Sequence, residues 1–346
     1  MSTSIAIFTL TKQGLQLAQK LAAGLDGRAT LFATLRHAEG TDATPFDSLA
    51  DCVSTHFTRF DGHIFIAAAG IVIRTIGPLM QDKTTDPAVV CLDQQGRFAV
   101  SLLSGHLGGG NALAEQCATI LGGQAVITTA TDSAGVPSMD MLAAENGMTI
   151  GNIDRVKVVN GALLDKRTVQ IFDQDNLLGL QSDTRFIDVT SKNEWSMGAP
   201  GVWVSYKDDC PDADALWLYP RVLMLGVGCR RGVPGDEIFN HIRNVFDAAG
   251  FSLDAIGGLA SVDLKADEAG LLETAANLGV EPTFYDKQRL DSVEAPNPSG
   301  AVMRRVGVQS VAEASALLLS DRGELLVEKT KTKTVTLAIA RRRKRT

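Results

Sequence analysis

Features that mark several common protein classes are scarce in this chain. The five cysteines, which are Cys52, Cys91, Cys117, Cys210 and Cys229, are scattered, and no two of them are spaced as C-x-x-C. This spacing argues against a disulfide framework and against a cysteine-based zinc site. No stretch approaches the roughly 20 consecutive apolar residues that a membrane helix needs. The first residues show neither the basic stretch nor the apolar run of a secretory signal, so we expect a cytoplasmic protein.

Basic residues are also outnumbered. The chain has 33 Lys and Arg against 40 Asp and Glu, which gives a net charge of −7. Five of the basic residues lie in the last six positions, 341–346, so the rest of the chain is more acidic still. An acidic body argues against nucleic acid or an anionic membrane as the partner. We expect residues 341–346 to form a basic, disordered tail, with a nucleic-acid patch as the alternative interpretation.

What the chain does contain is a regular alternation of short apolar runs and amphipathic stretches. Its 346 residues are 45% hydrophobic and include 33 glycines, enough for more than one core joined by tight turns. Strands are predicted at 4–10, 29–35 and 63–69, a hairpin at 88–102 and helices at 13–25 and 111–121. The predicted fold is multi-domain α/β. Residues 1–135 form a mostly parallel sheet with helices on both faces, 136–219 a small α+β domain, and 220–340 a second α/β domain.

Glycine and polar residues are densest between positions 70 and 132, in segments that adjoin predicted strands. Three loops are expected there, at 69–78, 81–87 and 101–111. Glycine lets the backbone approach a ligand closely, and a helix that starts after a loop directs N–H groups at an anion. The loop before the 111–121 helix therefore suits a carboxylate or phosphate, although it could be a structural turn. The candidate ligand-binding residues in this region are Gly70, Arg74, Lys83, Asp86, Ser104, Gly105, Gly108, Gly109 and Asn111.

His106 is the strongest candidate for a catalytic residue. It is the only histidine in a glycine-rich loop between a predicted strand and a predicted helix. An imidazole is well suited to proton transfer near neutral pH. Asp132 follows another predicted strand, so it could orient His106 or hold a water molecule, or simply cap the next helix. No catalytic residue is expected in the segment from about 133 to 219.

A second glycine motif occurs at 225–232, where G-x-G-x-x-x-G follows a predicted strand. The dinucleotide fingerprint is G-x-G-x-x-G, so a nucleotide site is disfavoured and an anion-binding turn that includes Arg230 is preferred. Lys265 and Glu268 are further candidates for ligand binding, although alone they are typical of a helix start. Cys229 could be a nucleophile, but no histidine lies near it in the sequence.

Taken together, these motifs resemble the cobalt-precorrin-5A hydrolases, the CbiG family of anaerobic cobalamin synthesis. The resemblance covers nearly the whole chain, in the right order, and is weakest in the middle. It rests on Gly70–Leu79, Asp82–Val90, Ser101–Gly109, Ile127–Asp132, Leu225–Gly232, Leu259–Glu268 and Val306–Ala314. The family pattern has alanine where this chain has Gly110, which is a small departure.

The resemblance implies an enzyme that opens the δ-lactone of cobalt-precorrin-5A and releases carbon-20 as acetaldehyde. It implies no cofactor and no metal site, because cobalt arrives inside the corrinoid substrate. Any contact with neighbouring pathway enzymes would be transient, and the sequence does not define an oligomeric state. Two alternatives are a non-catalytic protein that binds tetrapyrrole intermediates and a nucleotide-dependent α/β enzyme.

Overall fold

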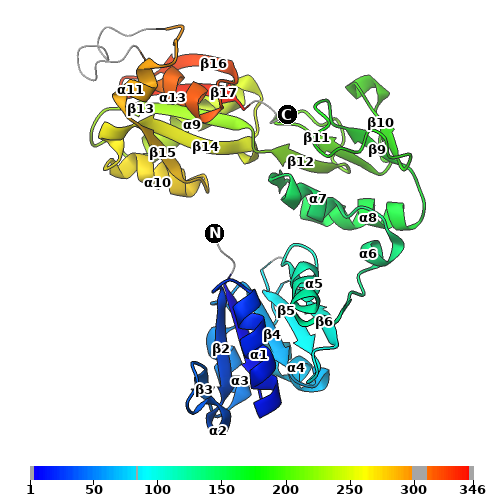
Figure 1. The fold of residues 1–346 in the computed structure, drawn as a ribbon. Coiled ribbons are helices and arrows are strands. Elements are labelled where there is room, and N and C mark those ends of the chain that lie inside the picture. Colours follow the sequence, from blue (N-terminus) through cyan, green and yellow to red (C-terminus); the bar gives the residue numbers. More distant parts are fainter. Residues whose placement is uncertain (1–3, 83–84, 298–309, 343–346) are drawn as a thin grey trace. The chain divides into compact units, whose positions relative to one another are not determined.

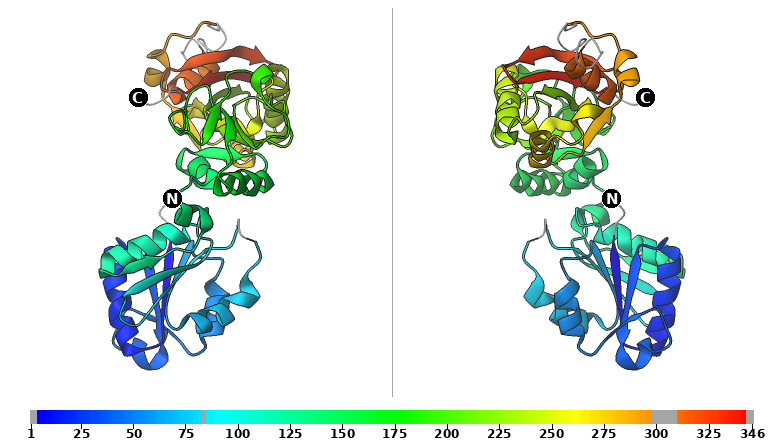
Figure 2. Two further views of the ribbon diagram at one scale, coloured as in Figure 1. Left: turned by 90° about the vertical axis from the view of Figure 1, so that its right-hand side faces the viewer. Right: turned by 90° about the vertical axis from the view of Figure 1, so that its left-hand side faces the viewer.

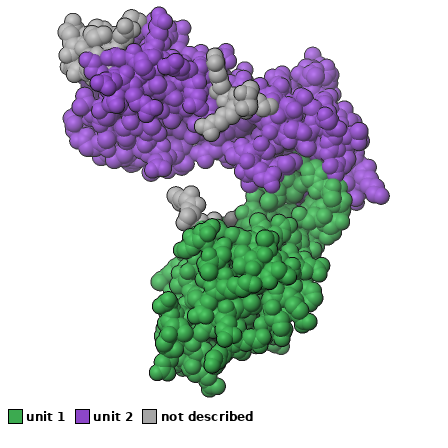
Figure 3. Space-filling view, in the orientation of Figure 1, with its two compact units in different colours: residues 1–141 green, residues 142–346 purple. Residues whose placement is uncertain are grey.

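The chain forms two compact units, residues 1–141 and residues 142–346, which are coloured separately in Figure 3. The computed structural model describes residues 4–82, 85–297 and 310–342. Three sheets, each with mostly parallel strands, confirm the expected multi-domain α/β class (Figure 1). The three-domain boundaries drawn from the sequence stay a prediction. Within the described ranges, no helix has the length and apolar character needed to cross a membrane.

The first unit contains a seven-stranded sheet with the strand order β3-β2-β1-β4-β5-β6-β7. In chain order its strands are β1 (Ile5–Thr9), β2 (Ala29–Thr34), β3 (Thr44–Phe46), β4 (Gly62–Ile66), β5 (Ala88–Leu92), β6 (Phe98–Leu103) and β7 (Gln124–Val126). The helices of this unit are α1 (Lys12–Gly24), α2 (Leu35–Ala38), α3 (Leu49–His56), α4 (Ala69–Ile76), η1 (Gly77–Leu79), α5 (Gly110–Leu121) and α6 (Ala130–Ala134), and α7 (Met139–Glu145) begins in it.

One hairpin reverses the direction of the sheet. Strands β1 to β5 are parallel to one another, whereas β6 pairs antiparallel with β5 and β7 is parallel to β6. The turn between β5 and β6 contains Gly96, whose φ of 68° is the left-handed conformation that glycine adopts without strain. As a result, the carboxyl ends of β6 and β7 lie on the same side of the sheet as the amino ends of β1, β4 and β5. This row of strand ends is one edge of the sheet, and the opposite strand ends form the other edge.

Helices cover both faces of this sheet (Figure 2). Successive side chains of a strand point to opposite faces, so Ile5 and Ile7 pack with α1 and α5, while Ala6 and Phe8 pack with α3 and α4. Burial on both faces explains why the strands are almost wholly apolar rather than alternating. The predicted arrangement of helices on both faces is therefore confirmed.

The segment that includes Gly70 and Arg74 was expected to be a loop, and this is wrong. It forms helix α4, in which Val72 and Ile76 are buried at the i, i+4 spacing of one helix face. The run Ile71-Val72-Ile73 gives no period that separates a helix from a strand by sequence alone. Packing of Val72 and Ile76 against the sheet decides the conformation.

The second unit holds two five-stranded sheets. The middle sheet has the order β10-β9-β11-β12-β8, and only its edge strand β8 runs antiparallel. Its elements are β8 (Met148–Ile150), η2 (Ile153–Arg155), α8 (Val156–Leu164), β9 (Val169–Phe172), β10 (Phe186–Asp188), η3 (Lys192–Glu194), β11 (Gly201–Val204) and β12 (Leu216–Pro220). The middle region is thus a small sheet dominated by parallel strands. Phe172 stacks on Trp203 in its core, with 3.9 Å between ring centroids.

The last sheet has the order β15-β14-β13-β17-β16. Strands β13, β14 and β15 are parallel to one another, whereas β17 pairs antiparallel with both of its neighbours, β13 and β16. Its strands are β13 (Leu223–Cys229), β14 (Ile256–Val262), β15 (Pro282–Tyr285), β16 (Glu324–Lys331) and β17 (Val335–Arg341). The helices around it are α9 (Gly235–Ala249), η4 (Leu253–Ala255), η5 (Asp263–Lys265), α10 (Ala269–Asn277), α11 (Lys287–Asp291) and α13 (Val311–Leu319).

The basic C-terminal segment begins inside the fold rather than beyond it. Arg341 is the last residue of β17 and forms an ion pair with Asp175. The backbone N–H of Arg342 donates to the Val222 carbonyl at 2.8 Å. The disordered tail expected at 341–346 therefore does not include these two residues. Residues 343–346 lie outside the described part of the chain.

Candidate active site

His106 lies in a tight loop between β6 and α5. Ser104, directly after β6, has a φ of 53°, and Gly109, directly before α5, has a φ of 82°. These two residues, both in the left-handed backbone conformation, reverse the direction of the chain within a few positions. The chain then continues as helix α5, which packs against the sheet that it has just left. Gly108 is required by the close packing of this loop, because a Cβ atom there would lie 2.3 Å from the Ser104 Cβ.

The loop uses several of its own N–H groups. Gly109 N–H donates to the His106 carbonyl at 2.8 Å, Gly110 N–H to the Ser104 carbonyl at 2.9 Å, and Asn111 N–H to the Gly105 carbonyl at 2.9 Å. These three groups include the first donors of α5, which would otherwise point at a ligand. The expected anion cradle therefore cannot rely on them, and their evident role is to hold His106 in place.

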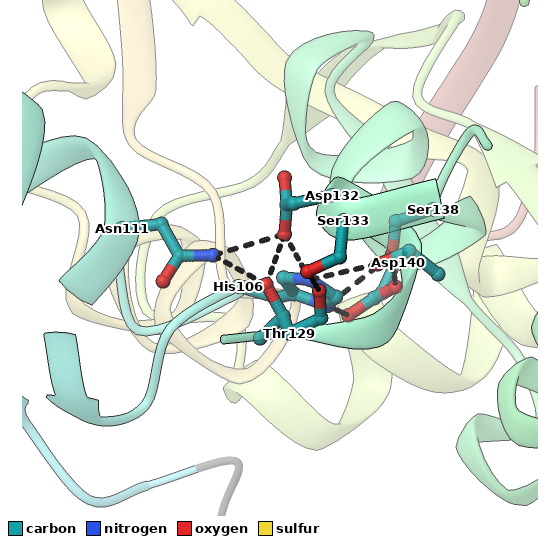
Figure 4. A network of polar contacts seen from close by, with 8 residues as sticks. His106, Asn111, Thr129, Asp132, Ser133, Ser138 and Asp140 are labelled. Atoms are coloured by element: carbon teal, nitrogen blue, oxygen red, sulfur yellow. Dashed lines mark hydrogen bonds and ion pairs between the residues drawn. The ribbon is translucent and has the colours of Figure 1, made fainter. Parts of the chain in front are cut away.

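Asp132 lies beside one ring nitrogen of His106 (Figure 4). Its Oδ2 is 3.1 Å from His106 Nε2, and the Thr131 hydroxyl is 3.2 Å from the same nitrogen. The same Oδ2 accepts hydrogen bonds from the Asn111 amide at 3.1 Å and from the Thr129 hydroxyl. The structure thus brings together three residues that the sequence separates by up to 26 positions, His106, Asn111 and Asp132.

These contacts keep Asp132 ionised. Partial burial acts to raise the pKa of its carboxyl group, but hydrogen bonds from Thr129 and His106 outweigh burial and lower the pKa. The Asp132 side chain is nevertheless 47% exposed, against 20% for His106. In Figure 4 its second oxygen points away from the polar network. A carboxylate that is both ionised and accessible is available to a substrate or to water.

The other ring nitrogen of His106 faces residues that sequence analysis missed. Nδ1 is 3.3 Å from Asp140 Oδ2 and 3.3 Å from the Ser138 hydroxyl. Ser138 in turn donates to the other carboxylate oxygen of Asp140. These residues stand at the start of α7, in the segment where no catalytic residue was expected. A serine two positions before an aspartate at a helix start is so common that it gave no signal.

Two further predicted residues of this region, Asp86 and Ser104, meet each other. The Ser104 hydroxyl donates to the Asp86 backbone carbonyl at 2.8 Å. Both carboxylate oxygens of Asp86 lie 3.0 Å from the Gln81 N–H, and Asp86 is buried. Asp86 therefore closes its own turn. Lys83 lies outside the described residues.

Gly70 and Arg74 are not placed with the histidine loop as expected. Helix α4 follows β4, and β4 runs antiparallel to β6, so Gly70 at the start of α4 lies at the opposite edge of the sheet from Ser104. The expectation that the three loops meet at one edge is wrong for Gly70, because the hairpin reverses the strand direction. Arg74 is exposed one turn later, and its guanidinium donates to the Gly70 carbonyl at 3.3 Å.

A cavity of about 630 Å³ opens beside the histidine loop. Leu107, Gly108 and Gly109 line it from the loop, and Asp86 and Ala88 line it from β5 and the turn before it. Arg28 adds a basic side chain to the wall. The cavity thus lies at the same edge of the sheet as His106, next to an exposed leucine side chain.

In the second unit, Lys265 and Glu268 form a pair. Lys265 Nζ lies 2.8 Å from Glu268 Oε2, and the side chains are only 14% and 6% exposed. The hydrogen bond from Lys265 lowers the pKa of Glu268, which also accepts the Gly232 N–H at 2.7 Å. Since each charge is compensated by the other, neither is a free charge for a ligand. Arg230, in the same unit, is held by its backbone N–H at 2.9 Å from the Thr334 carbonyl.

The glycine motif of the second unit has a packing explanation. A Cβ atom at Gly226 would lie 1.8 Å from the Ala312 carbonyl oxygen, so glycine lets α13 approach β13 closely. Burial raises the pKa of the neighbouring Cys229 thiol, which disfavours a thiolate nucleophile. In the described part of the chain, no group of three or more His, Cys, Asp or Glu residues is arranged to hold a metal ion.

Comparison with known proteins covers most of the chain. Three family models match, described as "Cobalamin synthesis G N-terminal" at residues 51–132, "Cobalamin biosynthesis central region" at 137–220 and "Cobalamin synthesis G C-terminus" at 223–340. A cobalt-precorrin-5A hydrolase from Salmonella typhimurium is 36% identical over 94% of both chains.

A second cobalt-precorrin-5A hydrolase, from Priestia megaterium, is 28% identical over 94% of this chain and 91% of the relative. A crystal structure of a cobalamin biosynthesis protein G homolog from Sulfolobus solfataricus is 21% identical, covers 98% of this chain and 97% of its own, and has a TM-score of 0.38. On the strength of the sequence matches, this chain belongs to the cobalt-precorrin-5A hydrolases, the CbiG family of cobalamin biosynthesis.

Proposed function

We propose that this chain is an enzyme that hydrolyses cobalt-precorrin-5A, with His106 as the residue that moves the proton. Family membership supports the substrate, and one observation supports the site. That observation is a histidine set between two aspartates, at the edge where β6 and β7 both end. Ligands bind at the carboxyl ends of strands in open α/β sheets, and here the rule applies to the reversed pair β6 and β7.

The reaction needs a base twice. First a water molecule attacks the lactone carbonyl, and a base takes its proton while the ring opens to a carboxylate and a hydroxyl group. Then the hydroxyl on carbon-20 loses its proton, its oxygen forms the carbonyl of acetaldehyde, and the bond to the macrocycle breaks. The electron pair of that bond stays on the macrocycle, which takes up a proton. His106 can accept each proton at Nε2, because neutral imidazole is a base near neutral pH.

The cavity beside the histidine loop supports binding of the substrate. Its position next to Leu107 and Gly108 would place part of the corrinoid periphery close to the loop. Arg28, which lines the cavity, is the basic group that we assign to a substrate carboxylate, and an arginine can hold a carboxylate through two parallel hydrogen bonds. The proposal needs no separate cofactor, because cobalt is bound within the substrate, and it places the reaction in the cytoplasm.

The test is acetaldehyde release from cobalt-precorrin-5A by the wild type and by His106→Ala. We expect the substitution to lower turnover by about 10²–10⁴-fold, the usual contribution of a general base. Substrate binding should persist, because the cavity and the basic residues remain. His37→Ala is the matched control, since it removes a histidine of the same unit outside the site and should leave turnover unchanged.

Two results would contradict the proposal in different ways. A wild-type protein that binds the substrate but releases no acetaldehyde would be a binding protein for tetrapyrrole intermediates. Normal turnover by His106→Ala at saturating substrate would leave the hydrolase activity standing and assign the proton transfer to another group. Asp132 would then be the next candidate, because it is ionised and exposed.

A further inference from the structure

The two carboxylates that flank His106 differ in burial. Asp140, on the Nδ1 side, is 11% exposed, whereas Asp132, on the Nε2 side, is 47% exposed. A neutral imidazole carries one hydrogen and can donate to only one of them. A carboxylate that loses its donor inside the protein is penalised more than one that water can reach. Burial therefore favours a hydrogen on Nδ1, facing Asp140.

The hydrogen bonds around Nδ1 lead to the same assignment. Ser138 has one hydroxyl hydrogen, and its hydroxyl donates to Asp140. With that hydrogen used, the Ser138 oxygen can only accept at Nδ1, and an ionised Asp140 can only accept as well. Both groups that face Nδ1 at 3.3 Å are then acceptors, so Nδ1 must be the donor.

The Nε2 side places a weaker demand on the ring, because water can reach Asp132, the acceptor that faces Nε2 at 3.1 Å. Asp132 Oδ2 already accepts from Thr129 and from Asn111, so it does not depend on a hydrogen from His106. The Thr131 hydroxyl, 3.2 Å from Nε2, can donate to an unprotonated nitrogen. Nε2 can therefore lose its hydrogen without leaving a buried acceptor unpaired.

We propose that Asp140, braced by Ser138, is the positioning residue of this site and holds His106 as the tautomer protonated at Nδ1. Nε2 is then the nitrogen that exchanges protons, and it faces the exposed carboxylate of Asp132 (Figure 4). This assignment gives the orienting role, which the sequence suggested for Asp132, to a residue of α7. The catalytic part of the proposal rests on the proposed function, but the tautomer does not.

The charged groups that contact His106 come from two helices. Asp132 belongs to α6 and Asp140 to α7, while α5 contributes the neutral Asn111 to the same network. The protonated ring donates to both carboxylates, and the neutral ring keeps only the donor toward Asp140. The two forms of the ring therefore differ on the Nε2 side, and the Nδ1 side is hydrogen-bonded in both.

Nitrogen-15 NMR of the histidine side chains tests the tautomer in the full-length protein without substrate. Protonated and unprotonated ring nitrogens have well separated shifts, and the His106 signals are those missing from His106→Gln. In spectra of the neutral ring, we expect the hydrogen on Nδ1 in the wild type and in Asp132→Asn. In Asp140→Asn the population should shift toward Nε2. A wild-type ring protonated at Nε2 would overturn the proposal.

Turnover provides the second test. Asp140→Asn should lower kcat by roughly 10²–10⁴-fold with KM changed less than about threefold, as expected when a histidine is held in the wrong tautomer. Ser138→Ala should have a smaller effect in the same direction. Glu145→Gln is the matched control, since it neutralises an exposed carboxylate at the other end of α7, and it should leave kcat unchanged.

The outcomes separate this proposal from the proposed function. If the wild type releases no acetaldehyde, the proposed function fails, while the NMR experiment still decides the tautomer. If the wild type turns over and Asp140→Asn keeps its kcat and pH profile, the positioning role fails alone. If Asp140→Asn does not fold, the wild-type tautomer and the turnover of Ser138→Ala still support or overturn the role.

Discussion

At the scale of single residues, His63 shows what burial without a carboxylate does to a histidine. Its ring is buried in β4, stacks on Phe57 with 5.3 Å between centroids, and contacts the Phe57 carbonyl at 2.9 Å through Nε2. Burial lowers its pKa from 6.5 to about 4, so it is neutral at physiological pH. His106 differs in its surroundings, because it is partly exposed and has a carboxylate beside each ring nitrogen.

His63 should make the first unit sensitive to mild acid. Its pKa of about 4 in the folded state lies below the unfolded value of 6.5, so the unfolded chain binds the proton first as the pH falls. The contribution of His63 to stability is complete above pH 6.5 and is lost as the pH falls toward 4. The loss at pH 5 should be about 2 kcal/mol. Urea titrations followed by circular dichroism at pH 8 and pH 5 measure it.

The variant His63→Leu isolates this effect from other titrating groups. Its own stability at pH 8 does not matter, because the measured quantity is the difference between the two pH values. We expect the free energy of unfolding to depend less on pH in the variant than in the wild type. An equal loss of stability in both proteins would show that His63 does not titrate in this range.

The sequence identified one half of the histidine site and missed the other half for a physical reason. His106 and Asp132 each follow a strand in the sequence, and adjacent parallel strands bring their ends together, so local patterns were sufficient. Asp140 stands in no distinctive pattern, and its contact with His106 depends on how the chain returns after α6. A residue that acts through a tertiary contact alone leaves no periodic signal.

At the scale of elements, the loop between β6 and α5 needs glycine at positions where there is no room for a Cβ atom, and not only where the backbone must be flexible. A Cβ atom at Gly108 would meet the Ser104 carbonyl oxygen at 2.8 Å, and one at Gly110 would meet the Leu103 carbonyl oxygen at 2.6 Å. Both neighbours are backbone atoms, which cannot rotate away.

Gly108→Ala should displace the loop and the histidine it carries. The clash with Ser104 should cost about 1–3 kcal/mol of stability, as overpacking usually does. Turnover should fall as well, because His106 is two residues away. Thermal unfolding and acetaldehyde release measure the two effects. In Gly161→Ala, inside α8, the new methyl group has no atom within 4 Å, so this control should be neutral or stabilising by up to about 1 kcal/mol. Equal behaviour of the two variants would contradict the packing argument.

Whether a segment forms a strand or a hairpin was more predictable than the direction of each strand and the edge of the sheet at which each loop lies. The hairpin that the sequence predicts at 88–102 is present as β5 and β6. A hairpin reverses the strand direction, so the loops after β6 and after β4 lie at opposite edges of the sheet, and the predicted meeting of Gly70 with Ser104 is wrong. Helix α4 was missed because a short apolar run has the same appearance in a buried strand and in a buried helix.

At the scale of the whole molecule, each of the two units has hydrophobic clusters of its own. Two clusters of the first unit sandwich its sheet, with Leu21 and Val53 among their buried members. A cluster of the second unit includes Ile242 and Phe246 of α9. All three tryptophans of the chain, Trp195, Trp203 and Trp217, belong to the second unit. Tryptophan fluorescence therefore monitors one unit, while circular dichroism monitors both.

Separate cores predict separate responses to core substitutions. Leu21 of α1 and Ile242 of α9 are both fully buried, and truncation of such a side chain to alanine costs about 2–5 kcal/mol. In urea, Leu21→Ala should move part of the circular dichroism transition to lower denaturant and leave the fluorescence midpoint in place. Ile242→Ala should move the fluorescence midpoint. The two variants serve as controls for each other, since each removes a similar apolar volume from a different core. If either substitution moved both signals together, the units would unfold as one cooperative system, and stability at the histidine site would depend on the core of the second unit as well as on its own.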